Sequence, residues 1–114
     1  MPNRYREGPD STFTHMSNTY RVDDLIDAVE HHVEFSIECC ELEWIFSTPE
    51  NRPDPRRVAA ADTTVPIIIT QMVGGYFVVL DGLHRLAKSV VMGSPRIRVK
   101  FVPEHIVRRL KSVE

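Results

Sequence analysis

Apolar residues recur at the helical spacing of three and four positions in three stretches of the chain. This spacing predicts amphipathic helices over residues 20–33, 83–92 and 103–113. Gly93 follows the second stretch, where a glycine can adopt the left-handed conformation that commonly ends a helix. Pro103 opens the third stretch, and proline suits the first turn of a helix.

Other stretches have the pattern of β-strands. Residues 65–71 and 76–80 are runs rich in β-branched residues, and the two adjacent glycines between them predict a hairpin. Residues 35–45 alternate in polarity and change phase near Cys40, which predicts an irregular strand. Residues 96–101 alternate basic and apolar side chains, as in a strand with one face exposed to solvent.

A proline-rich segment separates the first strand from the hairpin. Residues 47–57 contain three prolines, which predict an irregular loop, and long loops in small domains often carry function. Asp54 is a good helix N-cap and Pro55 a good first helical residue, so a short helix is expected through 58–61.

The order of these elements predicts an α+β domain in which helices flank a small mixed sheet. Residues 1–18 are polar and rich in turn formers, and we expect them to form a loosely docked tail. The single domain would then comprise residues 19–114.

Composition supports a soluble globular domain. The chain has 114 residues, of which 42% are apolar and 26% charged, which argues against disordered, collagen-like and disulfide-scaffold classes. No apolar run approaches the roughly 20 residues that cross a bilayer, and the N-terminus lacks the apolar stretch of a secretory signal. We therefore expect a cytoplasmic protein with no membrane partner.

The cysteines and the paired histidines do not have the spacing of a metal site. Cys39 and Cys40 are adjacent, so a disulfide between them would strain the backbone, and we expect reduced thiols. His31 and His32 also follow one another directly, whereas two ligands on one helix face would be four positions apart. These residues are expected to be structural or solvent-facing.

Charge is distributed unevenly along the chain. Residues 1–81 contain 6 Lys and Arg against 14 Asp and Glu, whereas residues 82–114 contain 8 against 2. The basic segment could face phosphate groups. Alternatively, two oppositely charged segments pack beside each other in one domain.

The segment after the second hairpin strand has the strongest chemical pattern. Asp81 and Gly82 end that strand, and His84, Arg85 and Lys88 then crowd the start of the next helix. The helix dipole disfavours cations there, whereas the free backbone N–H groups favour a phosphate, and Gly82 permits close backbone approach. Asp81 could hold Mg²⁺ or orient His84. The alternative is an ordinary capped turn with a solvent-facing polar surface.

The stretch PIIITQMVGGYFVVLDGLHRLAKSVVMGSPRIRVKFV resembles the core of the ParB/sulfiredoxin superfamily. The likeness covers residues 65–102, centres on the DGLHR segment and extends weakly over 35–64. In this superfamily the glycine turn and the following helix N-terminus bind the phosphates of a nucleotide. The resemblance implies a phosphate site made by the following residues: Arg52, Gly82, Leu83, His84, Arg85 and Lys88.

Departures from the family pattern indicate which branch of the superfamily the chain resembles. Sulfiredoxins have a catalytic cysteine where this chain has Leu83, so sulfinic acid reduction is not expected. Chromosome-partition ParB proteins have Glu-Arg-Arg after the glycine and a DNA-binding module downstream, for which the stretch after Val91 is too short. The chain most resembles free-standing bacterial and phage members, which include small-molecule kinases.

The resemblance implies phosphotransfer from ATP, ADP or another nucleoside phosphate, with Mg²⁺, to a small molecule that carries a hydroxyl group. Glu50 matches the general base of the kinases by position, with Asp54 and Glu43 as substitutes. His84 and Arg85 would stabilise charge on the transferred group. Nucleotide hydrolysis or nuclease action by the same groups is the competing enzymatic hypothesis.

A non-catalytic binding module for nucleic acid or a protein is the alternative to an enzyme. Two basic faces on the last strand and the last helix could follow a phosphate backbone. They comprise Arg96, Arg98, Lys100, Arg108, Arg109 and Lys111. The simpler interpretation makes the strand residues an ordinary solvent face.

Overall fold

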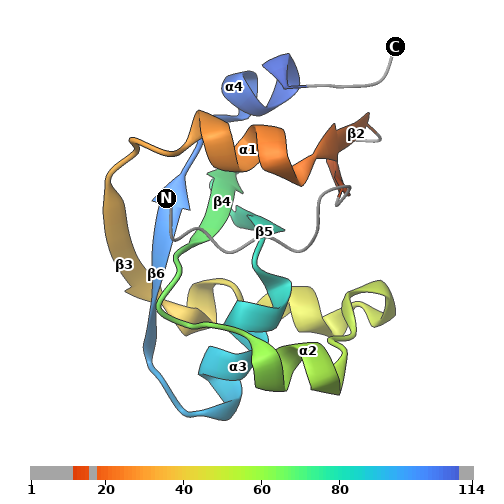
Figure 1. Ribbon diagram of the computed structural model, residues 1–114, viewed down its shortest axis with the longest axis vertical. Coiled ribbons are helices and arrows are strands. Elements are labelled where there is room, and N and C mark those ends of the chain that lie inside the picture. Colours follow the sequence, from red (N-terminus) through yellow and green to blue (C-terminus); the bar gives the residue numbers. More distant parts are fainter. Residues whose placement is uncertain (1–11, 16–17, 111–114) are drawn as a thin grey trace.

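The computed structural model describes residues 12–15 and 18–110 (Figure 1). The described residues form one four-stranded sheet and one two-stranded hairpin. The sheet contains β3 (Glu34–Glu38), β4 (Ile67–Gln71), β5 (Phe77–Asp81) and β6 (Arg96–Phe101), and the hairpin contains β1 (Thr12–His15) and β2 (Asn18–Arg21). The helices are α1 (Val22–Ala28), α2 (Pro55–Ala60), α3 (Leu83–Val91) and α4 (Glu104–Arg109).

The sheet is mixed, with strand order β3-β6-β4-β5. β4 and β5 form the predicted antiparallel hairpin, β6 lies parallel to β4, and β3 pairs antiparallel with β6. This confirms an α+β domain in which helices flank a small mixed sheet. Within the described residues, no helix has the length and apolar character that a bilayer crossing requires.

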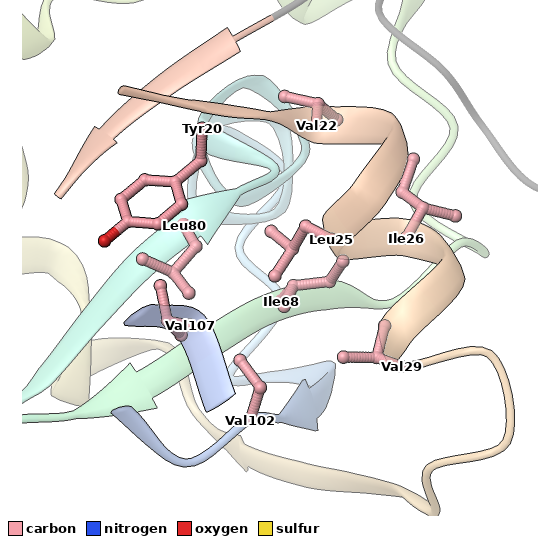
Figure 2. Close-up of a cluster of buried hydrophobic side chains, with 9 residues drawn as sticks. All are labelled: Tyr20, Val22, Leu25, Ile26, Val29, Ile68, Leu80, Val102 and Val107. Atoms are coloured by element: carbon pink, nitrogen blue, oxygen red, sulfur yellow. The ribbon is translucent and has the colours of Figure 1, made fainter. Parts of the chain in front are cut away.

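Alternating side chains of β4 divide the apolar residues into two cores. One core, which we call the α1-side core, is drawn in Figure 2 and comprises Tyr20, Val22, Leu25, Ile26, Val29, Ile68, Leu80, Val102 and Val107. The other, the α3-side core, comprises Cys39, Leu42, Ile45, Ile67, Ile69, Leu86, Ile97 and Val99. Figure 1 shows α1 and α4 at one end of the molecule and α2 and α3 at the other.

Leu86 lies at the centre of the contact between α3 and the sheet. It is fully buried, and Leu83 and Val90 pack against the same core, which confirms the predicted phase of this helix. Leu86→Ala should lower the free energy of unfolding by about 2–5 kcal/mol, because it removes buried methyl groups and leaves a cavity. Urea denaturation measures this loss. Val91→Ala, on the exposed side of α3, is the control and should change stability by about 0.5 kcal/mol or less. Equal losses in the two variants would contradict this packing.

Two predicted helix ends are confirmed by their hydrogen bonds. Gly93 follows α3 with a φ of 76°, and its N–H donates to the carbonyl of Val90 at 3.0 Å. At the start of α2, the side chain of Asp54 accepts a hydrogen bond from the N–H of Arg56 at 3.0 Å, and Pro55 is the first helical residue. Both ends follow from local chemistry.

The first helix is shorter than the predicted range 20–33. The chain is still extended at Arg21, and α1 ends before Val29. Nζ of Lys100 donates to the carbonyls of Val29 and Glu30 at 3.1 and 3.0 Å. A cation from β6 therefore satisfies the carbonyls that a longer helix would have bonded within itself.

The prediction of a strand over residues 35–45 is wrong beyond residue 38. There the chain forms three 3₁₀ turns: η1 (Cys39–Glu41), η2 (Glu43–Ser47) and η3 (Pro49–Asn51). Cys39, Leu42 and Ile45 are buried at intervals of three, which is the period of a 3₁₀ helix. The phase change near Cys40 marks the end of the strand rather than an irregularity within it.

The predicted tail, 1–18, includes β1, which pairs antiparallel with β2. The sequence pattern predicts no strand there, and residues 1–11 and 16–17 lie outside the described residues. The helix predicted over 103–113 ends at Arg109, and residues 111–114 are likewise outside them. In the described part of the chain, both cysteines are free thiols, Cys39 buried and Cys40 exposed.

Candidate functional site

The turn between β5 and α3 depends on a glycine. Gly82 is buried, has a φ of 115° and precedes the first residue of α3. A Cβ atom at this position would lie 2.4 Å from Cγ2 of Ile67, well inside van der Waals contact. We expected Gly82 to allow a ligand to approach the backbone closely. On the side where its Cβ would point, strand β4 approaches the glycine instead.

The first turn of α3 has features that favour an anion. No described side chain caps its N-terminus, and the first turn of the helix contains no acidic residue. The early N–H groups of a helix have no partner within the helix, and they lie at the positive end of its dipole. Backbone groups of Leu83, His84 and Arg85 therefore offer a place for a phosphate oxygen.

Arg85 is directed into the protein. Its side chain is 2% exposed, and Nη2 donates to Oδ2 of Asp81 at 2.8 Å. Nη1 donates to the carbonyl of Pro66, also at 2.8 Å. The carboxylate four residues earlier neutralises the guanidinium, which allows both charged groups to be buried at the end of the sheet.

This ion pair changes the role expected for Asp81. The carboxylate is 7% exposed, and one of its oxygens is already bound to the guanidinium of Arg85. Among the described residues, no group of three or more His, Cys, Asp or Glu side chains is placed to hold a metal ion. Asp81 therefore pairs with Arg85 and belongs to no such group in the described part of the chain.

His84 makes the contact that joins α3 to the proline-rich loop. The N–H of Asp54 donates to Nε2 of His84 at 3.2 Å. The pKa of His84 is lowered, first by burial and then by the cation of Arg57, while Asp54 acts in the opposite direction. Because Nε2 accepts a hydrogen bond, the proton of the neutral ring is on Nδ1.

Lys88 is occupied elsewhere. Its Nζ donates to the carbonyls of Ala59 and Ala61 at 2.8 and 2.9 Å. These carbonyls lie at the end of α2, where a cation stabilises the helix dipole. Lys88 therefore binds α2 to α3 and is not directed at the first turn of α3.

The C-terminal end of the proline-rich loop contacts the first turn of α3. Asp54 contacts His84 directly, and Arg52, two residues earlier, is exposed. Glu50 lies in η3, and the substitute base Glu43 is exposed in η2.

Arg57 was not among the residues that the sequence predicted for the site. Its side chain is exposed on α2, yet it is close enough to His84 to lower the pKa of that residue. The adjacent arginines after Pro55 were a visible signal, but only the packing of α2 against α3 shows where they lie.

The basic residues of β6 are paired within the protein. Arg98 bonds to Glu34 and to the carbonyl of Thr64, and Arg96 bonds to the carbonyl of Ser36 at 2.6 Å. Lys100 caps the end of α1, as described above. Arg96 and Arg98 thus lie exposed on the strand and pair with glutamates of β3, whereas Lys100 bonds to the residues after α1.

A cavity of about 370 Å³ lies beside the turn that contains Gly82. Asp81 and Arg85 form part of its lining, and α1, β3, β4, β6 and residues 62–66 form the rest. Its volume is within the range of small-molecule sites in proteins. The sequence pattern does not predict this cavity, because its lining residues come from segments far apart in the chain.

Comparison of the chain with family models, with curated proteins and with solved structures finds no match.

Proposed function

We propose that this chain is a cytoplasmic nucleotide-binding domain that holds the phosphates of ATP or another nucleoside phosphate at the N-terminus of α3. The observation that carries the proposal is the first turn of α3, which has neither a cap from a described side chain nor an acidic residue. It follows the strand–glycine–helix junction whose residues resemble those of the ParB/sulfiredoxin superfamily. We also propose that the chain has the fold of the ParB/sulfiredoxin superfamily.

The phosphate would be bound mainly by backbone groups and by the loop. Nδ1 of His84 carries a proton and can donate to a phosphate oxygen, while Nε2 remains bound to Asp54. Arg57, whose cation lowers the pKa of His84, and Arg52 of the proline-rich loop are both exposed, and they would supply the charge. Arg85 is a positioning residue, because it holds the turn through Asp81.

The reaction proposed for this site is phosphotransfer to a small molecule with a hydroxyl group, with hydrolysis of the nucleotide as the alternative outcome. Glu50 is the proposed general base, on its position in the loop. A Mg²⁺ ion would arrive as the counterion of the nucleotide. Phosphorus NMR of the products distinguishes transfer from hydrolysis, and unchanged nucleotide would indicate a binding module.

Two variants at one position test the phosphate site. His84→Glu places a carboxylate in the first turn of α3 and should weaken nucleotide binding about tenfold or more through charge repulsion. His84→Gln is the matched control, because it keeps an acceptor for the N–H of Asp54 without adding charge, and it should weaken binding less than His84→Glu, by the loss of the Nδ1 donor alone. Calorimetric titration with ATP, ADP, CTP and GTP measures both variants.

The result that would overturn the proposal is the absence of binding of all four nucleotides at millimolar concentration by the folded protein. Equal affinities of the two variants would exclude the first turn of α3 as the phosphate site. Tight DNA or RNA binding with a steep salt dependence would instead support the nucleic-acid-binding alternative.

A further inference from the structure

The cavity beside the Asp81–Arg85 pair is lined by apolar side chains and by acidic and basic side chains. Ile26 and Val29 of the α1 segment, Ile68 of β4 and Pro66 of the preceding loop form its apolar part. In Figure 2, Ile26 and Val29 lie at the margin of the α1-side core opposite Tyr20, so this core ends at the cavity. The polar groups determine what such a cavity can bind.

The two cations of the lining have their hydrogen bonds directed at the protein itself. Arg85 donates to Asp81 and to the carbonyl of Pro66. Lys100 donates to the carbonyls of Val29 and Glu30. A bound anion would have to compete with these bonds, so the cavity is poorly suited to a phosphate or a carboxylate.

The three carboxylates of the lining have acceptor capacity left. Glu34 bonds to Arg98 through Oε1, Asp62 bonds to Thr64 through Oδ1, and Asp81 binds its guanidinium partner through Oδ2. The second oxygen of each carboxylate accepts no hydrogen bond from the described part of the chain. Glu34 and Asp62 are exposed and stand at the solvent side of the cavity, whereas Asp81 is buried.

We propose that this cavity binds a small organic cation, with an ammonium or guanidinium group against the carboxylates and an apolar body against Ile26, Val29 and Ile68. A cation would supply the N–H donors that these oxygens lack, and charge-assisted hydrogen bonds are the stronger kind. The lining carries three acidic and two basic side chains, so its formal charge also favours a cation. This inference does not depend on nucleotide binding at α3.

Three probes of similar size test the chemistry of the cavity: n-hexylammonium, n-hexanol and n-hexanoate. Titrations of the full chain are followed by amide chemical shifts in NMR spectra. We expect n-hexylammonium to shift the amides of residues 26–29 and 62–66 and to bind at least about fivefold more tightly than the other two probes. Failure of n-hexylammonium to bind at 20 mM, taken as about the limit of a weak site, would overturn the proposal.

Two glutamates of β3 provide a matched pair of variants. Glu34 and Glu38 lie on the same face of the strand, and each pairs with an arginine of β6, but only Glu34 lines the cavity. Glu34→Gln should weaken n-hexylammonium binding about threefold or more, whereas Glu38→Gln should leave it unchanged.

Two further results would overturn the inference. Equal effects of the two substitutions would mean that only general surface charge attracts the probe. Equal binding of n-hexanol and n-hexylammonium would mean that the cavity is merely apolar. The NMR spectrum of each variant reports its folding in the same experiment.

Discussion

Asp81→Ala is expected to lower the free energy of unfolding by about 3–5 kcal/mol, because it removes a carboxylate that neutralises the buried guanidinium of Arg85. Arg85 is 2% exposed, so little water reaches the guanidinium to replace the lost carboxylate. Small domains have a total stability of about 5–15 kcal/mol, and the loss is therefore a large part of it. Urea denaturation measures the change.

A double variant tests whether the two charges act as a pair. Arg85→Met should also destabilise the protein, because it leaves the buried carboxylate of Asp81 unneutralised. Asp81→Leu combined with Arg85→Met should lose less than the sum of the two single variants, since no isolated charge remains. Additive losses would contradict the coupling.

The exposed ion pair of α4 is the control for this experiment. Arg108 lies four residues after Glu104, the same spacing as in the buried pair, and their charged atoms are 3.5 Å apart. Arg108→Ala should change stability by about 0.5 kcal/mol or less, because solvent screens a pair at the surface. Burial, and not sequence spacing, then accounts for the difference in stability loss between the two ion pairs.

Gly82→Ala is expected to lower the free energy of unfolding by about 2–5 kcal/mol. Two costs add at this position: about 1–2 kcal/mol for an L-residue in a left-handed conformation, and about 1–3 kcal/mol for forcing a methyl group into a packed core. The new Cβ would lie 2.4 Å from Cγ2 and 2.7 Å from Cβ of Ile67. Either β4 or α3 must move to relieve this clash.

Gly93→Ala separates these two costs. Gly93 also has a positive φ, of 76°, but a Cβ there would meet no described atom within 4 Å. Its substitution should therefore cost only about 1–2 kcal/mol, the conformational part. The difference between the two variants measures the contact with Ile67, and equal losses would show that this contact is unimportant.

Elements that depend on near neighbours in the chain could be predicted. The β4–β5 hairpin, the phase and end of α3 and the N-terminus of α2 follow from apolar spacing, glycine conformation and an N-cap at Asp54. The 3₁₀ turns were missed, although Cys39, Leu42 and Ile45 carry their period. A three-residue spacing in a short segment resembles a strand that changes phase, so only the observed backbone separates the two.

The sequence predicted the glycine turn before α3 but not the contacts around it. It could not show that Arg85 turns inward to Asp81, that Lys88 binds the end of α2, or that Arg57 approaches His84.

By itself, then, the sequence determined the local elements and the α+β class, because hydrogen bonds within a turn and apolar periodicity act over a few residues. Only the tertiary structure decided what each charged side chain does. His84 meets a loop residue 30 positions away, and Lys88 meets a carbonyl 29 positions away. The cavity likewise joins α1, β3, β4, β6 and the turn at Asp81. A buried charge must find a partner wherever the fold supplies one, and that choice depends on packing between distant segments.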